Sequence, residues 1–297
     1  MAGALVVTAV MAGCGGDDDD SGAGQAGGPN PQPAFYLTAD TPAELKRRAN
    51  RAGAEFARSQ GRGRSILILD FGGARLKHGV HGVSLRQGTF FTNDEVGAAL
   101  EEAARGYADH RRHGSATIVY VNSNAFIIKP GPGYTGLDTE TAREAGVQQA
   151  KTVAGLDLPR GVSASVGGDI EPGYDLFRKP EVSIAMVAGA NSVSKEPYFD
   201  VGTAPCEGEK CINGWTPEDL CKVSSGAGVE VLPEVYSEHP EDQPSQWAEI
   251  QKKCGIDSFA GVSAIEAGSF TPRESWHELR ERTSTRVEPV IVVFPAG

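Results

Sequence analysis

The sequence has 297 residues, of which 39% are hydrophobic and 23% are charged, so the chain is long enough to bury one large core. Its formal net charge at pH 7 is -11, and no basic stripe offsets that charge. These properties exclude the usual kind of nucleic-acid-binding protein, which needs a basic surface to contact phosphates.

The N-terminus predicts export and lipid attachment. Residues 4–14 are a short apolar run that ends in Met-Ala-Gly-Cys, which resembles the lipobox of bacterial lipoproteins, where the cysteine becomes the lipidated first residue. The run is too short to span a bilayer, and no Lys or Arg precedes it. We expect residues 1–14 to be a lipoprotein signal peptide with its lipobox, and a lipid on Cys14 to anchor the protein to the cell membrane, outside the cytoplasm.

The next segment contains almost nothing that could be buried. Residues 15–33 are mainly Gly, Asp, Pro, Ser and Gln, a composition typical of a flexible tether. We therefore expect a disordered tether over residues 15–33 and one folded domain over residues 34–297.

Short apolar runs that end in a carboxylate or an amide recur through this domain and alternate with amphipathic segments. Predicted strands cover residues 65–69, 116–121, 161–170, 198–201, 229–234, 259–265 and 288–295. Predicted helices begin at Thr41, Thr92, Thr139, Pro180, Thr216, Pro244 and Thr271. The alternation predicts an α/β fold, a (β/α)8-like TIM barrel with its site at the C-terminal ends of the strands. Because only seven strands can be counted, we expect the barrel to be incomplete or to include an irregular eighth segment.

Two carboxylates lie at the end of the strand that begins at Gly161. In an extended chain Asp169 and Glu171 point the same way, with α-carbons roughly 6–7 Å apart. Mutual repulsion in a pocket of low dielectric would raise the pKa of one of them. Asp70 and Glu234 end two other predicted strands and are expected on the same rim. The sequence therefore predicts a cluster of acids there.

Other features around this rim allow two interpretations. The segment from Gly72 to Thr92 is a long loop that either covers the site as a lid or is a mobile surface loop. Asn122 either binds a sugar or caps a turn, and Trp215 either lines a sugar platform or packs against the start of the next helix.

Without Cys14, four cysteines remain, an even number that suits two disulfides in an oxidising compartment. Three pairings are possible, and we favour Cys206–Cys211, which closes a short loop, with Cys221–Cys254 joining two helices. A zinc site has less support, because the sequence contains no Cys-x-x-Cys pair and no histidines cluster with these cysteines.

Several short motifs resemble a family of secreted bacterial proteins, mostly uncharacterised, that are regarded as glycoside-hydrolase-like TIM barrels. These motifs are Cys206-x4-Cys211-Ile-Asn-Gly-Trp-Thr, Val231-Leu-Pro-Glu-Val-Tyr236, Gln246-Trp247, Leu69-Asp-Phe-Gly, Ala104-Arg-Gly-Tyr107 and Asp169-x-Glu171. The resemblance extends from about Ser65 to Ala267 and implies the barrel fold and an activity on glycans. The pair Cys221–Cys254 lies outside the pattern.

Glycoside hydrolysis needs one protonated and one ionised carboxyl group on either side of the scissile bond. We expect Glu171 to be the acid, Glu234 the nucleophile or base, and Asp169 the group that tunes and orients Glu171. The predicted substrate-binding residues are Asp70, Asn122, Trp215 and Tyr236. The acids fall on the third and fifth predicted strands, whereas large retaining families with this fold place them on the fourth and seventh.

The alternative hypothesis is a catalytically silent surface lipoprotein that binds a glycan or a protein partner on the same rim. Glu171 and Glu234 carboxylates about 5–10 Å apart across a cleft would favour an enzyme, whereas burial against Arg or Lys would favour a structural network. No cofactor is implied, although a divalent cation among Asp70, Asp169 and Glu171 remains open.

Overall fold

The computed structural model describes residues 28–60, 64–123, 133–172, 179–236 and 242–296. The predicted signal peptide, Cys14 and the first part of the predicted tether lie outside the described residues, so both the lipid anchor and the tether before Gly28 remain predictions. In the described ranges, no helix is both long and apolar enough to cross a membrane.

Eight strand positions form the centre of the molecule, and three of them are split into two short segments. They are β1 (Pro31–Pro33) with β2 (Phe35–Tyr36), β3 (Ile66–Asp70), β7 (Ala116–Ser123), β9 (Val162–Ile170), β10 (Tyr198–Gly202), β13 (Val229–Pro233), β14 (Ser258–Phe259) with β15 (Val262–Ile265), and β16 (Arg286–Val287) with β17 (Ile291–Phe294). Each position pairs in parallel with the next along the chain, from β2 and β3 to β14 and β16. The other segments of the split positions continue the ladder, since β17 pairs with both β15 and β1. The pairing therefore runs full circle, as in a (β/α)8 TIM barrel.

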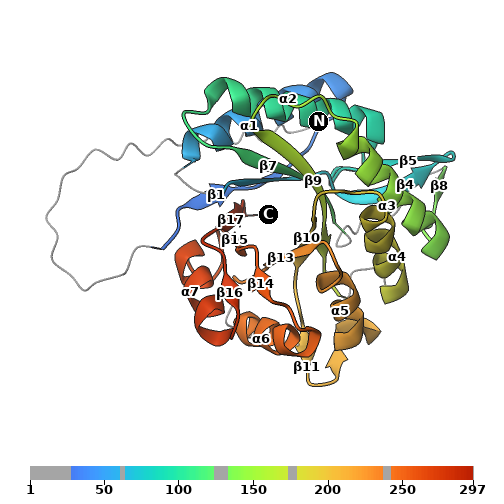
Figure 1. Cartoon of the computed structure of the whole chain (residues 1–297). Helices are drawn as coiled ribbons and strands as arrows, with labels where there is room; N and C mark the ends of the chain where they lie inside the picture. Colours follow the sequence, from blue (N-terminus) through green and yellow to red (C-terminus); the bar gives the residue numbers. More distant parts are fainter. Residues whose placement is uncertain (1–27, 61–63, 124–132, 173–178, 237–241, 297) are drawn as a thin grey trace, which may run out of the picture.

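Helices cover the outside of these strands (Figure 1). They are α1 (Pro42–Ser59), α2 (Asn93–His110), α3 (Thr139–Ala154), α4 (Pro180–Asn191), α5 (Pro217–Ser224), α6 (Gln243–Cys254) and α7 (Pro272–Arg282). The predicted caps Thr41 and Thr216 are confirmed, because each side chain accepts a hydrogen bond from a backbone N–H of the first helical turn. The predicted alternation of strand and helix is likewise confirmed.

The eighth strand position comes from the start of the domain, which corrects the predicted tether boundary. Pro31–Pro33 pairs with Ile291–Val293 in β17, and the backbone N–H of Ala34 donates to the carbonyl of Val293 at 2.8 Å. The Gln32 side chain also bonds to Arg64 and Ile66 at the start of β3. Two prolines made the segment resemble a tether, but proline is tolerated at the ends of a strand. The acid-bearing β9 and β13 are therefore the fourth and sixth strands.

The side chains inside the barrel form a compact apolar cluster. Its members are Ala34, Ile66, Ile68, Val119, Val121, Phe199, Val201, Leu232, Ala260, Val290, Val292 and Phe294. Side chains of opposite parity on the same strands, such as Leu67, Tyr120 and Val231, pack against the surrounding helices instead. The strands are thus buried on both faces, as parallel sheets require.

The segment predicted as a long loop is mostly a small antiparallel sheet. It contains β4 (Gly73–Lys77), β5 (Val80–Ser84) and β6 (Phe90–Thr92), joined at its other edge by β8 (Tyr134–Thr135). Figure 1 shows β4, β5 and β8 beside α3, at one side of the barrel. His78 and Gly79 have φ angles of 49° and 79°, and positive φ at both central residues is the requirement of a two-residue type I′ turn. His-Gly is a weaker hairpin signal than Asn-Gly, so the loop prediction was wrong.

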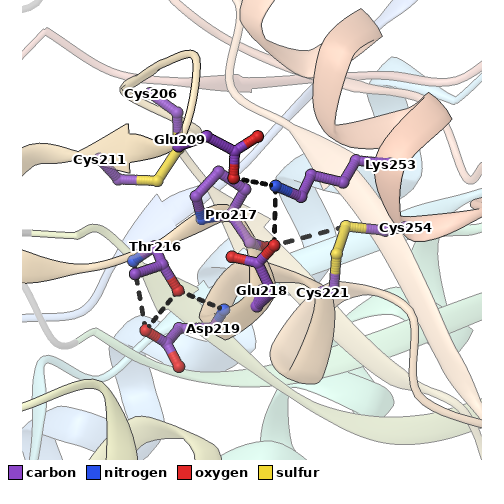
Figure 2. The surroundings of a disulfide bond; sticks show 10 residues. All are labelled: Cys206, Glu209, Cys211, Thr216, Pro217, Glu218, Asp219, Cys221, Lys253 and Cys254. Atoms are coloured by element: carbon purple, nitrogen blue, oxygen red, sulfur yellow. Dashed lines mark hydrogen bonds and ion pairs between the residues drawn. A yellow bond between two sulfur atoms is a disulfide. The ribbon is translucent and has the colours of Figure 1, made fainter.

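Both predicted disulfides are confirmed (Figure 2). Cys206–Cys211 closes the hairpin of β11 (Cys206–Glu207) and β12 (Lys210–Cys211), which the short 3-10 helix Ile212–Gly214 follows. Cys221–Cys254 joins α5 to α6. Two disulfides fit the predicted location outside the cytoplasm.

Candidate active site

The polar rim of the barrel follows directly from the alternation of side chains along each strand. Asp70, Ser123 and Glu234 each lie two residues after a member of the inner apolar cluster, at Ile68, Val121 and Leu232. A period of two therefore directs these three side chains into the mouth of the barrel.

The same rule applies on the neighbouring strands. Tyr36 lies two residues after Ala34 of the inner cluster. Asp169 lies two residues after Gly167, which pairs with the inward-facing Phe199, and Glu171 lies two residues further on. Six polar side chains from five strand ends therefore gather at the C-terminal rim.

Three of these side chains form a close carboxylate cluster. One carboxylate oxygen from each of Asp169, Glu171 and Glu234 lies within 4.8 Å of the other two. The Ser123 hydroxyl donates a 2.7 Å hydrogen bond to Oδ2 of Asp169, whereas Oδ1 of Asp169 has no hydrogen-bond partner among the described residues. The structure thus brings together all three predicted catalytic residues.

Burial and mutual repulsion hold protons on this cluster. Burial raises the pKa of Asp169 to about 6, while the hydrogen bond from Ser123 opposes the increase. Burial and the charge of Asp169 raise the pKa of both Glu171 and Glu234 well above the ordinary value. Asp169 is therefore the first of the three to ionise, and its charge keeps a proton on its neighbours.

Asp70, a predicted substrate-binding residue, extends the cluster. Its carboxylate is buried and accepts a 2.5 Å hydrogen bond from the backbone N–H of Gly72. Burial, followed by the charge of Asp169, raises the pKa of Asp70 to about 7. Asp70 can therefore hold or release a proton near neutral pH.

The predicted substrate-binding residue Tyr236 also lies at this rim. Its side chain lies close enough to Glu234 to oppose the increase in the pKa of that carboxyl group. Its backbone N–H donates a 2.9 Å hydrogen bond to Oε1 of Gln243, which holds the start of α6 to the end of β13. Tyr236 therefore lies beside Glu234 at the rim of the barrel.

Two predicted substrate-binding residues lie elsewhere. Asn122 is buried next to Tyr120 on the helix side of β7, because the inward position belongs to Ser123, one residue later. Trp215 is 1% exposed within the core between helices and strands, so it offers no face to a sugar. Both side chains are therefore buried away from the rim, and the structure does not place them with the other predicted substrate-binding residues.

Sequence reasoning missed Arg86, which approaches the cluster from the turn between β5 and β6. Its guanidinium carbon lies 3.9 Å from the centre of the Tyr36 ring. Its charge lowers the pKa of Asp70, Asp169 and Glu171, against the larger effect of burial. The sequence does not distinguish Arg86 from nearby Lys77 or Arg75. Arg86 comes near the acids only because the turn between β5 and β6 carries it there.

A second buried carboxyl group, at Asp200 on the outer face of β10, was also missed. The Ser224 hydroxyl of α5 donates to it at 2.6 Å. Burial raises the pKa of Asp200 to about 7, with a contribution from Asp169 on the neighbouring strand. The available signal was an acid inside the apolar segment Tyr198-Phe-Asp-Val201.

The oxygens of Asp169, Glu171 and Glu234 lie close enough to hold a divalent cation. The sequence had suggested Asp70, not Glu234, as the third ligand. Carboxylates that share protons have the same spacing, so the geometry alone does not favour a metal. The cation remains an open prediction.

Comparison with protein-family models gives no match, and comparison with curated proteins gives none. Among solved structures, the chain is similar to an AP endonuclease of family 2 from Brucella melitensis, with a TM-score of 0.44 and 15% identity, covering 91% of this chain and 94% of that one. It is also similar to a phosphoenolpyruvate phosphomutase from Streptomyces platensis subsp. rosaceus, with a TM-score of 0.40 and 12% identity, covering 90% and 76%. Likeness at this level gives no argument about activity, and the barrel assignment rests on the strand order.

Proposed function

We propose that this protein hydrolyses glycosidic bonds at the barrel rim, with Glu171 as general acid and Glu234 as nucleophile. The observation that carries the proposal is the cluster of Asp169, Glu171 and Glu234, whose oxygens lie within 4.8 Å of one another at the ends of the fourth and sixth strands. Two carboxyl groups with different protonation are the minimal apparatus for this reaction.

Each residue has a role that its surroundings support. A hydrogen bond from Ser123 holds the carboxylate of Asp169 in place. Burial and the charge of Asp169 keep a proton on Glu171, and a general acid needs that proton to protonate the leaving oxygen. Burial and Asp169 also raise the pKa of Glu234, so Glu234 must lose its proton before it attacks. Ionised Glu171 would raise that pKa further, and a protonated Glu171 therefore makes the ionisation of Glu234 easier. Tyr236 lies next to Glu234 and opposes the increase in the pKa of that carboxyl group.

The short separation supports a retaining mechanism. Retaining glycosidases place the two carboxyl groups about 5–5.5 Å apart, and inverting enzymes leave about 6.5–9.5 Å for a water molecule. An oxygen separation of at most 4.8 Å fits the first class. Glu234 would then attack the anomeric carbon as Glu171 protonates the leaving oxygen, and Glu171 would next activate the water that releases the sugar.

The rival hypothesis, a silent binding protein, has less support from the site. Among the described residues, no Lys or Arg forms an ion pair with Asp169 or Glu234. A purely structural network of buried acids would need such partners, because unpaired buried charge is costly. The cell-surface role proposed with this activity depends on the untested lipid anchor.

The test is reducing-sugar release from bacterial wall and capsular glycans by the full chain, beside the variants Glu171→Gln and Glu234→Gln. We expect each variant to lose at least a hundredfold in kcat without a decrease in the unfolding temperature, because Gln removes a buried carboxyl group of raised pKa. Azide should rescue Glu234→Ala if Glu234 is the nucleophile, because the anion can enter the space that the side chain leaves. Glycan binding without release by the wild type would favour the silent binding protein.

A further inference from the structure

Arg86 is held rigidly at the rim by its neighbours in the chain. Leu85 is fully buried, and its backbone N–H donates to the carbonyl of Thr89 at 3.0 Å across the turn between β5 and β6. The Gln87 side chain donates a 2.5 Å hydrogen bond to the carbonyl of Ala39, in the segment between β2 and α1. The backbone of Arg86 is therefore fixed on both sides, although its side chain is exposed.

The guanidinium of Arg86 stacks on the Tyr36 ring, and the described part of the chain offers its N–H groups no partner. It lies 3.9 Å above the Tyr36 ring, which in turn packs against Phe294 at 5.0 Å between ring centres. Among the described residues, no hydrogen bond or ion pair involves its N–H groups. Stacking on a ring fixes the plane of the guanidinium and leaves its edge available for an oxyanion.

The position of this cation beside the acids suggests what it binds. A carboxylate mouth repels an anionic substrate unless a cation offsets the charge where the anion lies. A cation that served only to neutralise the acids would contact them directly, whereas Arg86 stacks on Tyr36. A fixed guanidinium with a free edge matches the two oxygens of a carboxylate.

We propose that Arg86, stacked on Tyr36, is a specificity-determining residue that binds the carboxylate of an acidic sugar, so that the substrate of this site is a glycan containing uronic acid or another carboxylate-bearing sugar. The reaction itself rests on the proposed glycosidase function. Recognition of the sugar carboxylate by Arg86 does not depend on that function, because binding can be measured without turnover.

The experiment compares uronic-acid oligosaccharides with the same oligosaccharides after reduction of their carboxyl groups to alcohols. Binding is measured by calorimetry and hydrolysis by reducing-sugar release, for the full chain and for Arg86→Gln and Arg86→Lys. The matched control is Arg280→Gln, because Arg280 is an exposed arginine stacked on Trp276 at 5.1 Å. Sugar phosphates are included as a second kind of anion.

We expect the wild type to bind the acidic oligosaccharide about ten- to hundredfold more tightly than the reduced one. Arg86→Gln should remove that preference by raising KM for the acidic substrate with little change in kcat. Arg86→Lys should restore only part of it, because lysine lacks the paired donors of the guanidinium. Arg280→Gln should behave as the wild type.

Other results would overturn the inference. Equal loss of kcat on acidic and reduced substrates in Arg86→Gln would mean that Arg86 only tunes the acids. Equal wild-type affinity for the two substrates, or an Arg86-dependent preference for sugar phosphates over carboxylates, would also overturn it. Arg86-dependent binding of the acidic oligosaccharide without hydrolysis would support the carboxylate receptor and refute the glycosidase.

Discussion

Replacing Asp200 with Asn should make the protein more stable at alkaline pH and leave it nearly unchanged at acidic pH. Asp200 is 2% exposed and accepts one hydrogen bond, from Ser224, while its Oδ1 has no partner among the described residues. Burial raises the pKa of Asp200 to about 7 from the ordinary 3.8. The folded protein therefore keeps a proton that the unfolded chain releases between these two pH values.

The sign and size of the effect follow from this difference. As the pH rises from 3.8 to about 7, the folded state binds more protons than the unfolded state, so stability falls. The difference between the pKa of Asp200 in the unfolded chain, 3.8, and in the folded protein, about 7, corresponds to about 4 kcal/mol of lost stability at pH 8. Asparagine has nearly the same shape and never ionises, so Asp200→Asn removes this cost.

The assay is urea unfolding of the full chain at pH 5 and pH 8. The wild type should be less stable at pH 8 relative to Asp200→Asn, by up to about 4 kcal/mol, and the gap should shrink at pH 5. The control is Asp257→Asn, because Asp257 is exposed. A stability difference between Asp200→Asn and the wild type that is the same at both pH values would refute the reasoning.

Three further predictions concern the frame of the site. The double variant Cys221→Ser with Cys254→Ser should lose about 4 kcal/mol in urea unfolding, because the disulfide closes a separation of 33 residues; an unchanged midpoint would contradict it. Gln32→Ala should lose about 2 kcal/mol, since the side chain bonds to Arg64 and Ile66, whereas a true tether residue would show no loss. Dialysis against EDTA should leave sugar release unchanged, because the proposed chemistry uses carboxyl groups alone; activity restored by Mg²⁺ or Ca²⁺ would instead favour the open cation hypothesis.

The local signals in the sequence predicted much of the frame. Apolar runs that end in acids marked β3, β9 and β13, and the Thr-Pro pairs at Thr41 and Thr216 marked helix starts. These signals succeed because capping and strand alternation involve residues close together in the chain. The period of two also predicted that Asp169 and Glu171 would share a side.

Errors occurred where the decisive contact is distant in the sequence. Pro31–Pro33 is a strand only because β17, some 260 residues later, provides its hydrogen-bonding partner. The site uses Ser123 and not Asn122, because pairing with β9 decides which of two adjacent polar residues faces the barrel mouth. Arg86 reaches Tyr36 only through a hairpin whose turn sequence is a weak signal.

The sequence by itself determined the order of the seven helices and of the strands between them, narrowed the cysteines to three pairings, and identified the three clustered acids, because each depends on local pattern or on a small number of possible pairings. Tertiary structure alone decided the closure of the barrel and the distance between Glu171 and Glu234. It also decided the position of Arg86 near them and the burial that raises their pKa values. These properties depend on which strands become neighbours and on how deeply each side chain is enclosed, and neither is specified by the residues adjacent in the chain.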